Sequence, residues 1–552
     1  MGSGPLPPVS SAVLRLHQLQ IVKCTHQMDH QKQRDRRLIA KNTVFNLVGQ
    51  VLPMAVGVLT IPLIVRGLGT AQYGILSIAM MLLGYFNIFD LGLSRATVKF
   101  VAENLDPENI HKVPELIWTS FSLLVGLGII GATVAAIFVP ISVTHLFKMP
   151  AELAGQARMA LFVLCASMPI MLGNNALRGV LEAAQRFDLV NYVKVPSSVL
   201  FYLAAALAIP FGVRVAGIVS LLVFIRLAST LAYLSLCFRT IPGLASHFRV
   251  SRASLGPLAT FGGWIMVTNV TGPVFGYLER FMIASLLSVS MLAFYSAPYE
   301  LVSKLLIFPM SVAPSLFPYF SYHGSRKSSE VSEVTSRTLK YLFLVLTPPV
   351  AVFIFFARDI MNLWLGPQFA VQSTSVLQLT TLVFFLNAFA FVPFTSVQAL
   401  GRPDLKAILD LAAIPAYSVA AWWLIKHQGI NGAAFAKLLL TICDCIVLYI
   451  FASKLKAFAL RDCLSGPLLR AILASGGLLA VVLAVASMHL RLLLALPLVV
   501  LCFLGYAVMF WIFAVDVEDR TTIYGLRARV FAMLRARRSA TAMQISGNDA
   551  AL

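Results

Sequence analysis

The feature that most restricts the fold of this 552-residue chain is a series of apolar runs, each about 20 residues long. A helix of roughly this length is needed to cross about 30 Å of hydrocarbon. Apolar residues make up 59% of the chain and charged residues 12%, whereas about a quarter of the residues in soluble domains are charged. The sequence therefore predicts an all-α polytopic membrane protein.

About 14 transmembrane helices are expected, as two six-helix repeats followed by two C-terminal helices. The spans lie near residues 43–66, 73–93, 116–140, 158–178, 189–210, 215–238, 256–278, 281–305, 340–358, 375–397, 407–426, 429–451, 467–488 and 492–514. The repeat rests on GLGTAQYGILSIAM at 67–80, which can be aligned with LLSVSMLAFYSAPY at 286–299. Parallel repeats of this kind are typical of transporters in which one half rocks against the other.

The predicted organisation follows from these spans. It comprises a basic N-terminal tail (1–40), a first six-helix bundle (41–238), a linker (239–255), a second bundle (256–455), two additional helices (456–515) and a basic C-terminal tail (516–552).

The positive charges predict the orientation of the chain, because cytoplasmic segments retain lysine and arginine. With the N-terminus inside, 33 of the 43 Lys and Arg residues lie on the cytoplasmic side, eight in the opposite loops and two within spans. Arg280 and Lys148 are among the eight. Both termini and the linker are thus expected in the cytoplasm, and the net charge of +20 reflects topology rather than nucleic-acid binding.

Catalytic and metal motifs are not evident in the sequence. Cys443 and Cys445 are spaced i, i+2, so on a helix they point in nearly opposite directions and cannot share a metal ion. No nucleotide-binding or hydrolase fingerprint occurs in a suitable context, and the predicted exterior loops are too short for a catalytic domain. We therefore expect no enzyme activity, no metal and no cofactor.

Several motifs resemble those of a known transporter family. They are RGLGTAQYGILSIA at 66–79, FDLGLSRATVKFVAE at 89–103, NNALRGVLEAAQRFDLVNYVKV at 174–195, LGPQFA at 365–370 and ALGRPDLKAILDL at 399–411. In order and spacing they resemble the polysaccharide-transporter branch of the multidrug, oligosaccharidyl-lipid and polysaccharide exporter superfamily. The resemblance implies a flippase that carries a polyprenyl-diphosphate-linked oligosaccharide across a bacterial inner membrane, with lipids and possible polymerase and chain-length components as partners.

Three alternatives remain. A drug or cation antiporter of the same superfamily would carry more acidic residues within its spans. A peptidoglycan-precursor flippase resembles this chain less, because that branch has arginines in its first span and residues 43–65 contain none. A membrane polysaccharide polymerase would have comparable hydropathy, but usually carries a large external loop.

Charges within spans are candidate functional residues, because each costs about 2.5–3.5 kcal/mol at a helix centre. Arg226 and Lys437 are predicted to bind the substrate diphosphate, although either could belong to a structural ion pair instead. The acids Asp444 and Glu300 are predicted to couple transport to an ion, with pairing between Glu300 and Lys304 as the alternative. Polar wall residues are predicted to contact sugar: Asn46, Gln50, Asn174, Asn175, Asn269, Tyr295, Tyr299 and Asn387.

Charges near the predicted cytoplasmic ends of spans form a second group. Asp90 ends the second span, Arg178 follows the fourth, and Arg402 precedes the eleventh. They are predicted to line a cytoplasmic gate, although charges at such positions more often cap helices or pair with neighbours.

Overall fold

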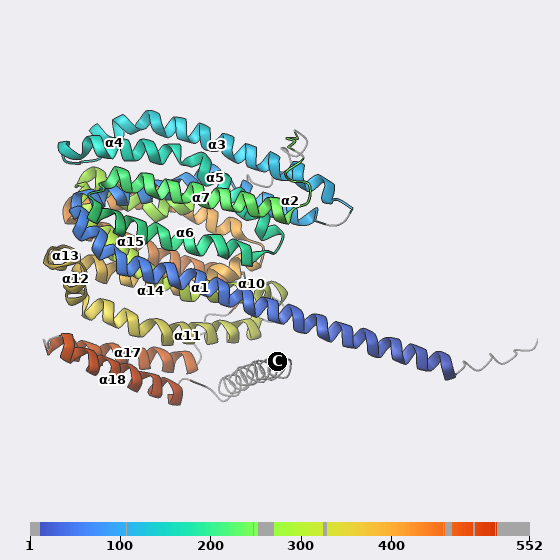
Figure 1. Cartoon of the computed structure of the whole chain (residues 1–552). Helices are drawn as coiled ribbons and strands as arrows, with labels where there is room; N and C mark the ends of the chain where they lie inside the picture. The colour runs from blue at the N-terminus through green and yellow to red at the C-terminus, as the bar shows by residue number, and fades with distance from the viewer. Residues whose placement is uncertain are drawn as a thin grey trace, which may run out of the picture. The chain divides into compact units, whose positions relative to one another are not determined.

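The computed structural model describes residues 11–105, 108–246, 248–251, 270–323, 328–455, 457–458, 466–488, 492–513 and 515, and it describes side chains from Gly49 onward except at 314–315, 323, 328–329, 466–467 and 492–496. Within these ranges every regular element is a helix (Figure 1). The chain packs as two compact units. Unit 1 contains Met1–Gly67, Phe86–Pro140 and Gln156–Asn269, and unit 2 contains Leu68–Tyr85, Ile141–Gly155 and Val270–Leu552.

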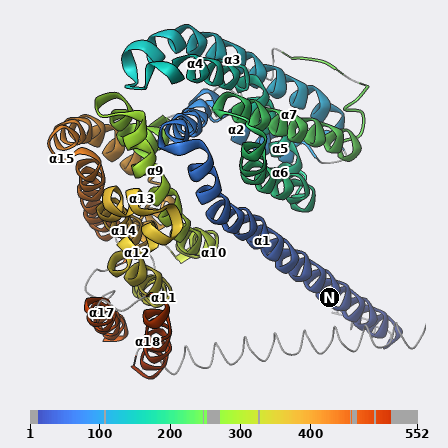
Figure 2. The same cartoon turned by 60° about the vertical axis from the view of Figure 1, so that its left-hand side comes forward.

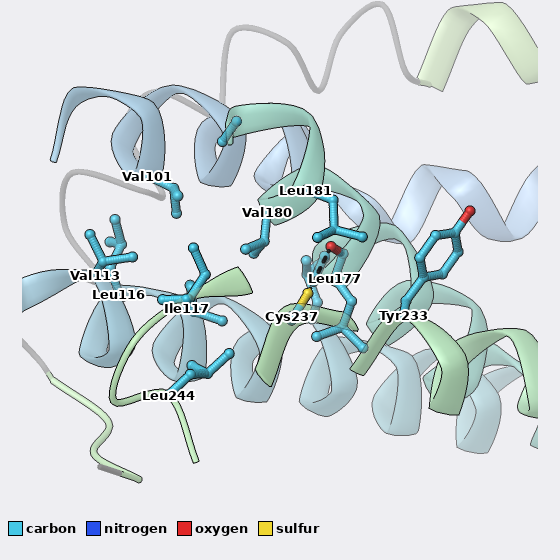
Figure 3. Packing of buried hydrophobic residues seen from close by; sticks show 14 of the residues in the cluster. Val101, Val113, Leu116, Ile117, Leu177, Val180, Leu181, Tyr233, Cys237 and Leu244 are labelled. Carbon is cyan, nitrogen blue, oxygen red and sulfur yellow. Dashed lines mark hydrogen bonds between the residues drawn. The ribbon is translucent and has the colours of Figure 1, made fainter. Parts of the chain in front are cut away.

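Unit 1 is built around helices that bury one apolar face each. Its elements are α1 (Ser11–Phe86) up to Gly67, η1 (Asn87–Asp90), α2 (Leu93–Glu103), η2 (Ile110–Lys112), α3 (Val113–Ile141), most of α4 (Ala151–Ala166), α5 (Met168–Ala183), α6 (Phe187–Ala208), η4 (Ile209–Phe211) and α7 (Val215–Thr240). In its core, Leu177 and Leu181 of α5 meet Tyr233 and Cys237 of α7 (Figure 3). The Cys237 thiol donates to the Leu177 carbonyl oxygen at 3.4 Å, which adds a polar contact between α5 and α7.

Unit 2 is centred on α14 (Thr374–Ala399), which packs against α9, α10, α11 and α15. Its other elements are residues 270–286, α9 (Val289–Ser303), η5 (Lys304–Leu306), α10 (Ile307–His323), α11 (Ser328–Phe355), α12 (Ala357–Leu365), α13 (Pro367–Gln372), α15 (Pro403–Lys454), α17 (Gly466–Ser487), α18 (Leu492–Phe513), the end of α1 and the π-helical turn η3 (Ser142–Leu146). Helices α17 and α18 lie side by side and α17 packs on α11 (Figure 1).

The predicted class is confirmed. Among the described residues, ten helical segments are long and apolar enough to cross a membrane, so the protein is a multi-pass membrane protein. Two segments cover two predicted spans each, because α1 changes direction at Gly69 (φ 74°) and α15 at Gly429 (φ 62°) (Figure 2). Positive φ angles are readily available only to glycine.

Part of the predicted organisation stays a prediction. The seventh span is predicted to begin within residues 252–269, which lie outside the described residues, as do residues 1–10 of the N-terminal tail and all of the C-terminal tail; residues 11–40 form the first part of α1. The count of about 14 spans and the six-plus-six division are therefore retained as predictions. Within unit 2, residues 68–85 and 141–155 from the first half of the sequence pack with residues from the second half.

Candidate functional site

A cavity of about 300 Å³ lies within unit 1, between α5, α6 and α7. Its lining contains three cations, five hydroxyl or amide side chains, three aromatic rings and one aliphatic residue. These are Arg178, Lys194, Arg226, Asn174, Asn175, Ser197, Ser198, Ser229, Phe201, Tyr202, Tyr233 and Ile225. The structure thus brings together Arg226, Asn174 and Asn175, which the sequence predicts as substrate contacts, and Arg178, which it predicts as a gate residue.

Positive charge dominates this cavity, because none of its lining residues is acidic. The Arg178 Nε atom lies 3.2 Å from Oε1 of Glu182, which partly neutralises it. Lys194 and Arg226 form no ion pair with any residue that the structure describes. Arg226 lies near the middle of α7, where an uncompensated cation is expensive unless it faces water or an anion, so the arrangement is suited to an anionic ligand.

Asn174 holds the helix turn that carries Arg226. Its Nδ2 atom donates to Ser229 Oγ at 3.1 Å and to Thr230 Oγ1 at 3.0 Å. Both hydroxyls in turn donate to the Arg226 carbonyl oxygen, at 2.7 Å and 2.9 Å. The network joins α5 to α7 at the backbone of Arg226, so Asn174 fixes the helix turn that carries Arg226 in addition to lining the cavity.

The α6 wall of the cavity was missed by the sequence analysis, although a signal for it exists. Lys194, Ser197, Ser198, Phe201 and Tyr202 recur at intervals of three or four residues, which places them on one face of a helix. Phe201 and Tyr202 stand edge to face with their ring centroids 6.0 Å apart. This face therefore offers one cation, two hydroxyl groups and two rings.

The other predicted sugar contacts lie elsewhere. Gln50 is exposed and does not line the cavity. Asn46 precedes the described side chains and Asn269 lies outside the described residues. Tyr295, Tyr299 and Asn387 belong to unit 2, so their contact with substrate stays a prediction.

Lys437 lies in a buried polar cluster of unit 2. Its Nζ atom is 3.6 Å from Glu279 Oε1 and donates to the Phe275 carbonyl oxygen. The Tyr417 hydroxyl donates to Glu279 Oε2 at 3.0 Å. Glu279 is 0% exposed and Lys437 8% exposed, so each charge has its partner within the protein. These contacts support the second of the two predictions for Lys437, that it belongs to a structural ion pair.

Glu300 is held between two cations. Its Oε1 atom lies 3.4 Å from Arg280 Nη1, and its Oε2 atom lies 3.4 Å from Lys304 Nζ, which confirms the predicted i, i+4 pair of Glu300 and Lys304.

The prediction that Arg280 lies in an exterior loop is wrong. Residues 270–286 are helical, the turn falls at 287–288, and Arg280 is 3% exposed. The Glu300 carboxylate and the Tyr299 ring, 4.1 Å from the guanidinium carbon, offset the burial of that charge.

Asp444 has a partner that the sequence did not indicate. Lys406 Nζ lies 2.6 Å from Asp444 Oδ1 and 2.6 Å from Asp410 Oδ1. Lys406 and Asp444 are 38 residues apart, and the kink at Gly429 separates them along α15. One lysine thus binds two carboxylates, which leaves the group with one net negative charge.

The remaining predicted gate residues have local partners. Asp90 is buried and accepts hydrogen bonds from the Ser94 backbone N at 3.1 Å and from Ser94 Oγ at 2.6 Å, which stabilises the start of α2. Arg402 is exposed and pairs with Asp404 at 3.0 Å, and these hydrogen bonds raise the pKa of its guanidinium. A gate role for either residue stays a prediction.

The described part of the chain has the fold of two solved multi-pass membrane transporters. The fold is shared with an inward-facing multidrug resistance MATE family transporter of the MOP superfamily, at a TM-score of 0.64, 16% identity and coverage of 74% of this chain and 98% of that one. It is also shared with an inward closed conformation of the lipid II flippase MurJ, at a TM-score of 0.67, 14% identity and coverage of 85% and 98%.

Residues 39–323 match the family described as polysaccharide biosynthesis protein, and the chain belongs to that family. A putative O-antigen transporter of Shigella flexneri is 28% identical over 422 residues, which cover 74% of this chain and 96% of the relative. A probable low-salt glycan biosynthesis flippase, Agl15 of Haloferax volcanii, is 23% identical over 180 residues, which cover 32% of this chain and 38% of the relative.

Proposed function

We propose that this protein is a flippase that moves a polyprenyl-diphosphate-linked oligosaccharide repeat unit from the cytoplasmic to the periplasmic leaflet of a bacterial inner membrane. The observation that carries the proposal is the unit 1 cavity, which combines Arg178, Lys194 and Arg226 with no acidic lining residue. The family and the O-antigen transporter relative support the same substrate class. Transport would serve surface or exopolysaccharide biosynthesis.

The cavity chemistry matches the two parts of such a substrate. A guanidinium can bind phosphate oxygens through two parallel hydrogen bonds, and an ammonium can bind them as a point charge. The amides and hydroxyls of Asn175, Ser197 and Ser198 can bond sugar hydroxyls, and the Phe201 and Tyr202 rings provide apolar faces for a pyranose ring. Translocation then needs binding and a conformational change, with no bond made or broken.

The position of the cavity suits loading from the cytoplasm. Arg178 is near the end of α5 and Lys194 near the start of α6, and the charge distribution predicts that the turn between these helices is cytoplasmic. Arg226 lies 11 residues beyond the start of α7 at Val215, or about 16 Å along the axis. The diphosphate would enter past Arg178 and Lys194 and reach Arg226 near mid-membrane, before alternating access exposes it to the periplasm.

Deleting the gene in its native host tests the proposal. Lipid-linked repeat units should accumulate on the cytoplasmic leaflet, and surface polysaccharide should disappear. Loss of a polymerase would instead leave single repeat units outside, and loss of a peptidoglycan-precursor flippase would arrest cell-wall synthesis. Unchanged surface polysaccharide, with no accumulated intermediate, would refute the flippase function. The proposed polymerase and chain-length partners would act on the flipped product.

The proposed topology predicts the outcome of reporter fusions. A fusion after Phe147, at the end of the α3–η3 segment, and a fusion after Gly366, between α12 and α13, should both report the periplasm. Fusions after Ala184 and Gly401 should report the cytoplasm as matched controls. A cytoplasmic signal from the Gly366 fusion would contradict the orientation of the second half.

We further propose that Asp444 or Glu300 couples transport to a proton or sodium gradient. Asp444 shares Lys406 with Asp410, and Glu300 binds Arg280 and Lys304, so protonation or cation binding would compete with these ion pairs. Asp444→Asn or Glu300→Gln should make export independent of pH or of sodium, depending on the coupling ion. Wild-type responses in both variants, measured over a range of pH and sodium concentration, would exclude both residues.

A further inference from the structure

Two buried glycines bring α1 close to α6 within unit 1. A Cβ atom added at Gly49 would lie 3.0 Å from Asn191 Oδ1 and 3.1 Å from Val195 Cγ2. One added at Gly57 would lie 3.1 Å from Tyr202 Cζ. All three partners belong to α6, so α1 packs against the helix that forms one wall of the cavity.

The Gly57 contact is made with the flat face of the Tyr202 ring. The added Cβ atom would lie 3.1, 3.2 and 3.3 Å from Cζ, Cε1 and Cε2. Nearly equal distances to these three atoms place Gly57 over the ring face, at the hydroxyl end of the ring. Ordinary van der Waals contacts of a Cβ atom begin at 3.4 Å, so the ring would have to shift if residue 57 carried a side chain.

The Tyr202 ring also lines the cavity. One of its faces lies against α1, and Phe201 stands edge to face with it at a centroid distance of 6.0 Å. Protein therefore holds the ring on these two sides, and the open space beside it is the cavity. A larger residue at position 57 would push the ring into that space, because a close-packed contact yields where there is room.

Tyr202 stands at the outer end of the polar face of α6. Lys194, Ser198 and Tyr202 are four residues apart, so they follow one face of the helix, and Tyr202 lies about 12 Å along the axis from Lys194. A diphosphate bound by the cations of the cavity would leave its first sugar beside the serines and the two rings of this face. The Tyr202 ring is thus a part of the wall that this sugar would contact.

We propose that Gly57 is a positioning residue for Tyr202, and that the two together set the bulk of the sugar that the protein accepts next to the diphosphate. This inference rests on the proposed function, because it concerns a property of the same substrate. Glycine at position 57 lets the ring lie back against α1 and leaves the cavity wide. A side chain at that position would advance the ring and exclude the bulkier sugars.

Thiol labelling tests whether residue 57 sets the width of the cavity. Ser198→Cys would be introduced into a full-length chain whose seven native cysteines are replaced by serine. The purified protein would be labelled with methyl methanethiosulfonate and with benzyl methanethiosulfonate, whose six-membered ring resembles a pyranose in size. Adding Gly57→Val should slow the benzyl reagent several-fold relative to the methyl reagent. Adding Tyr202→Ala to that chain should remove the difference.

Gly126→Val is the matched control, because Gly126 of α3 is also in unit 1 and a Cβ atom there meets nothing within 4 Å. It should leave the ratio of the two labelling rates unchanged. Gly57→Ala requires the ring to shift by only a few tenths of an ångström, so it should change the ratio less, in the same direction, and carries the test if the valine chain does not fold. A ratio in the folded Gly57 variants equal to that of Gly126→Val would overturn the proposal.

Export measures the consequence for the substrate. In a flippase-deleted host, Gly57→Val should lower surface polysaccharide several-fold, normalised to protein in the membrane, and adding Tyr202→Ala should restore part of it. A loss that Tyr202→Ala does not relieve would show damage to helix packing and overturn the role in selection. The labelling needs no substrate, so it separates failure of this inference from failure of the flippase function, which the gene deletion tests.

Discussion

Arg226→Gln should reduce export of surface polysaccharide by roughly 10- to 100-fold, because a hydrogen bond to a charged group contributes about 1.5–3 kcal/mol. Arg226 lines the cavity near the middle of α7 and has no acidic partner among the described residues. Arg226→Lys should retain partial export, since lysine preserves the charge but not the planar fork. Export would be measured in a flippase-deleted host and normalised to protein in the membrane.

The design separates substrate binding from folding. Arg214→Gln removes an exposed arginine at the start of the same helix, outside the cavity, and should export normally. Because Arg226 has no described ion pair to break, Arg226→Gln should reach the membrane in normal amount. Normal export by a normally expressed Arg226→Gln protein would exclude a role in binding. A low amount of protein, restored by neutralising an acid elsewhere, would show a structural pair.

Lys437→Met should destabilise the protein by about 3–5 kcal/mol, because it leaves the buried Glu279 carboxylate without its cation. Adding Glu279→Gln should recover much of that loss, since a neutral amide can still accept from the Tyr417 hydroxyl. The readouts are the yield of monodisperse protein in detergent and its midpoint of thermal unfolding.

Lys426→Met provides the control for this pair. Lys426 is on the same helix but is exposed, with its ammonium 4.1 Å from the Trp422 ring centroid, so its loss should change stability little. A Lys437→Met protein of wild-type stability that no longer exports polysaccharide would contradict the structural role. It would favour the substrate contact that the sequence predicts.

Only part of the candidate site could be predicted from the sequence. Arg226 stood out because an arginine at mid-span is rare in any membrane helix, and its place in the cavity agrees with that signal. Lys194 was overlooked, although with Ser197, Ser198 and Tyr202 it forms a polar face on α6 that helical spacing predicts. Lys437 is also a cation within a predicted span, but it forms an ion pair with Glu279. A charged residue in a span therefore indicates that a partner exists, without saying whether the partner is protein or substrate.

By itself the sequence determined that this protein is an all-α, multi-pass membrane protein, because hydropathy is a local property and about 20 apolar residues suffice to cross a bilayer. It also predicted breaks between spans near residues 66–73 and 426–429, where the structure has the kinks at Gly69 and Gly429. Only the tertiary structure decided which charges are paired and which are free. Lys406 meets Asp444 across a kink, and Lys148 meets residues 284–289 from the other half of the chain. Such contacts depend on how distant helices pack, which no local pattern specifies.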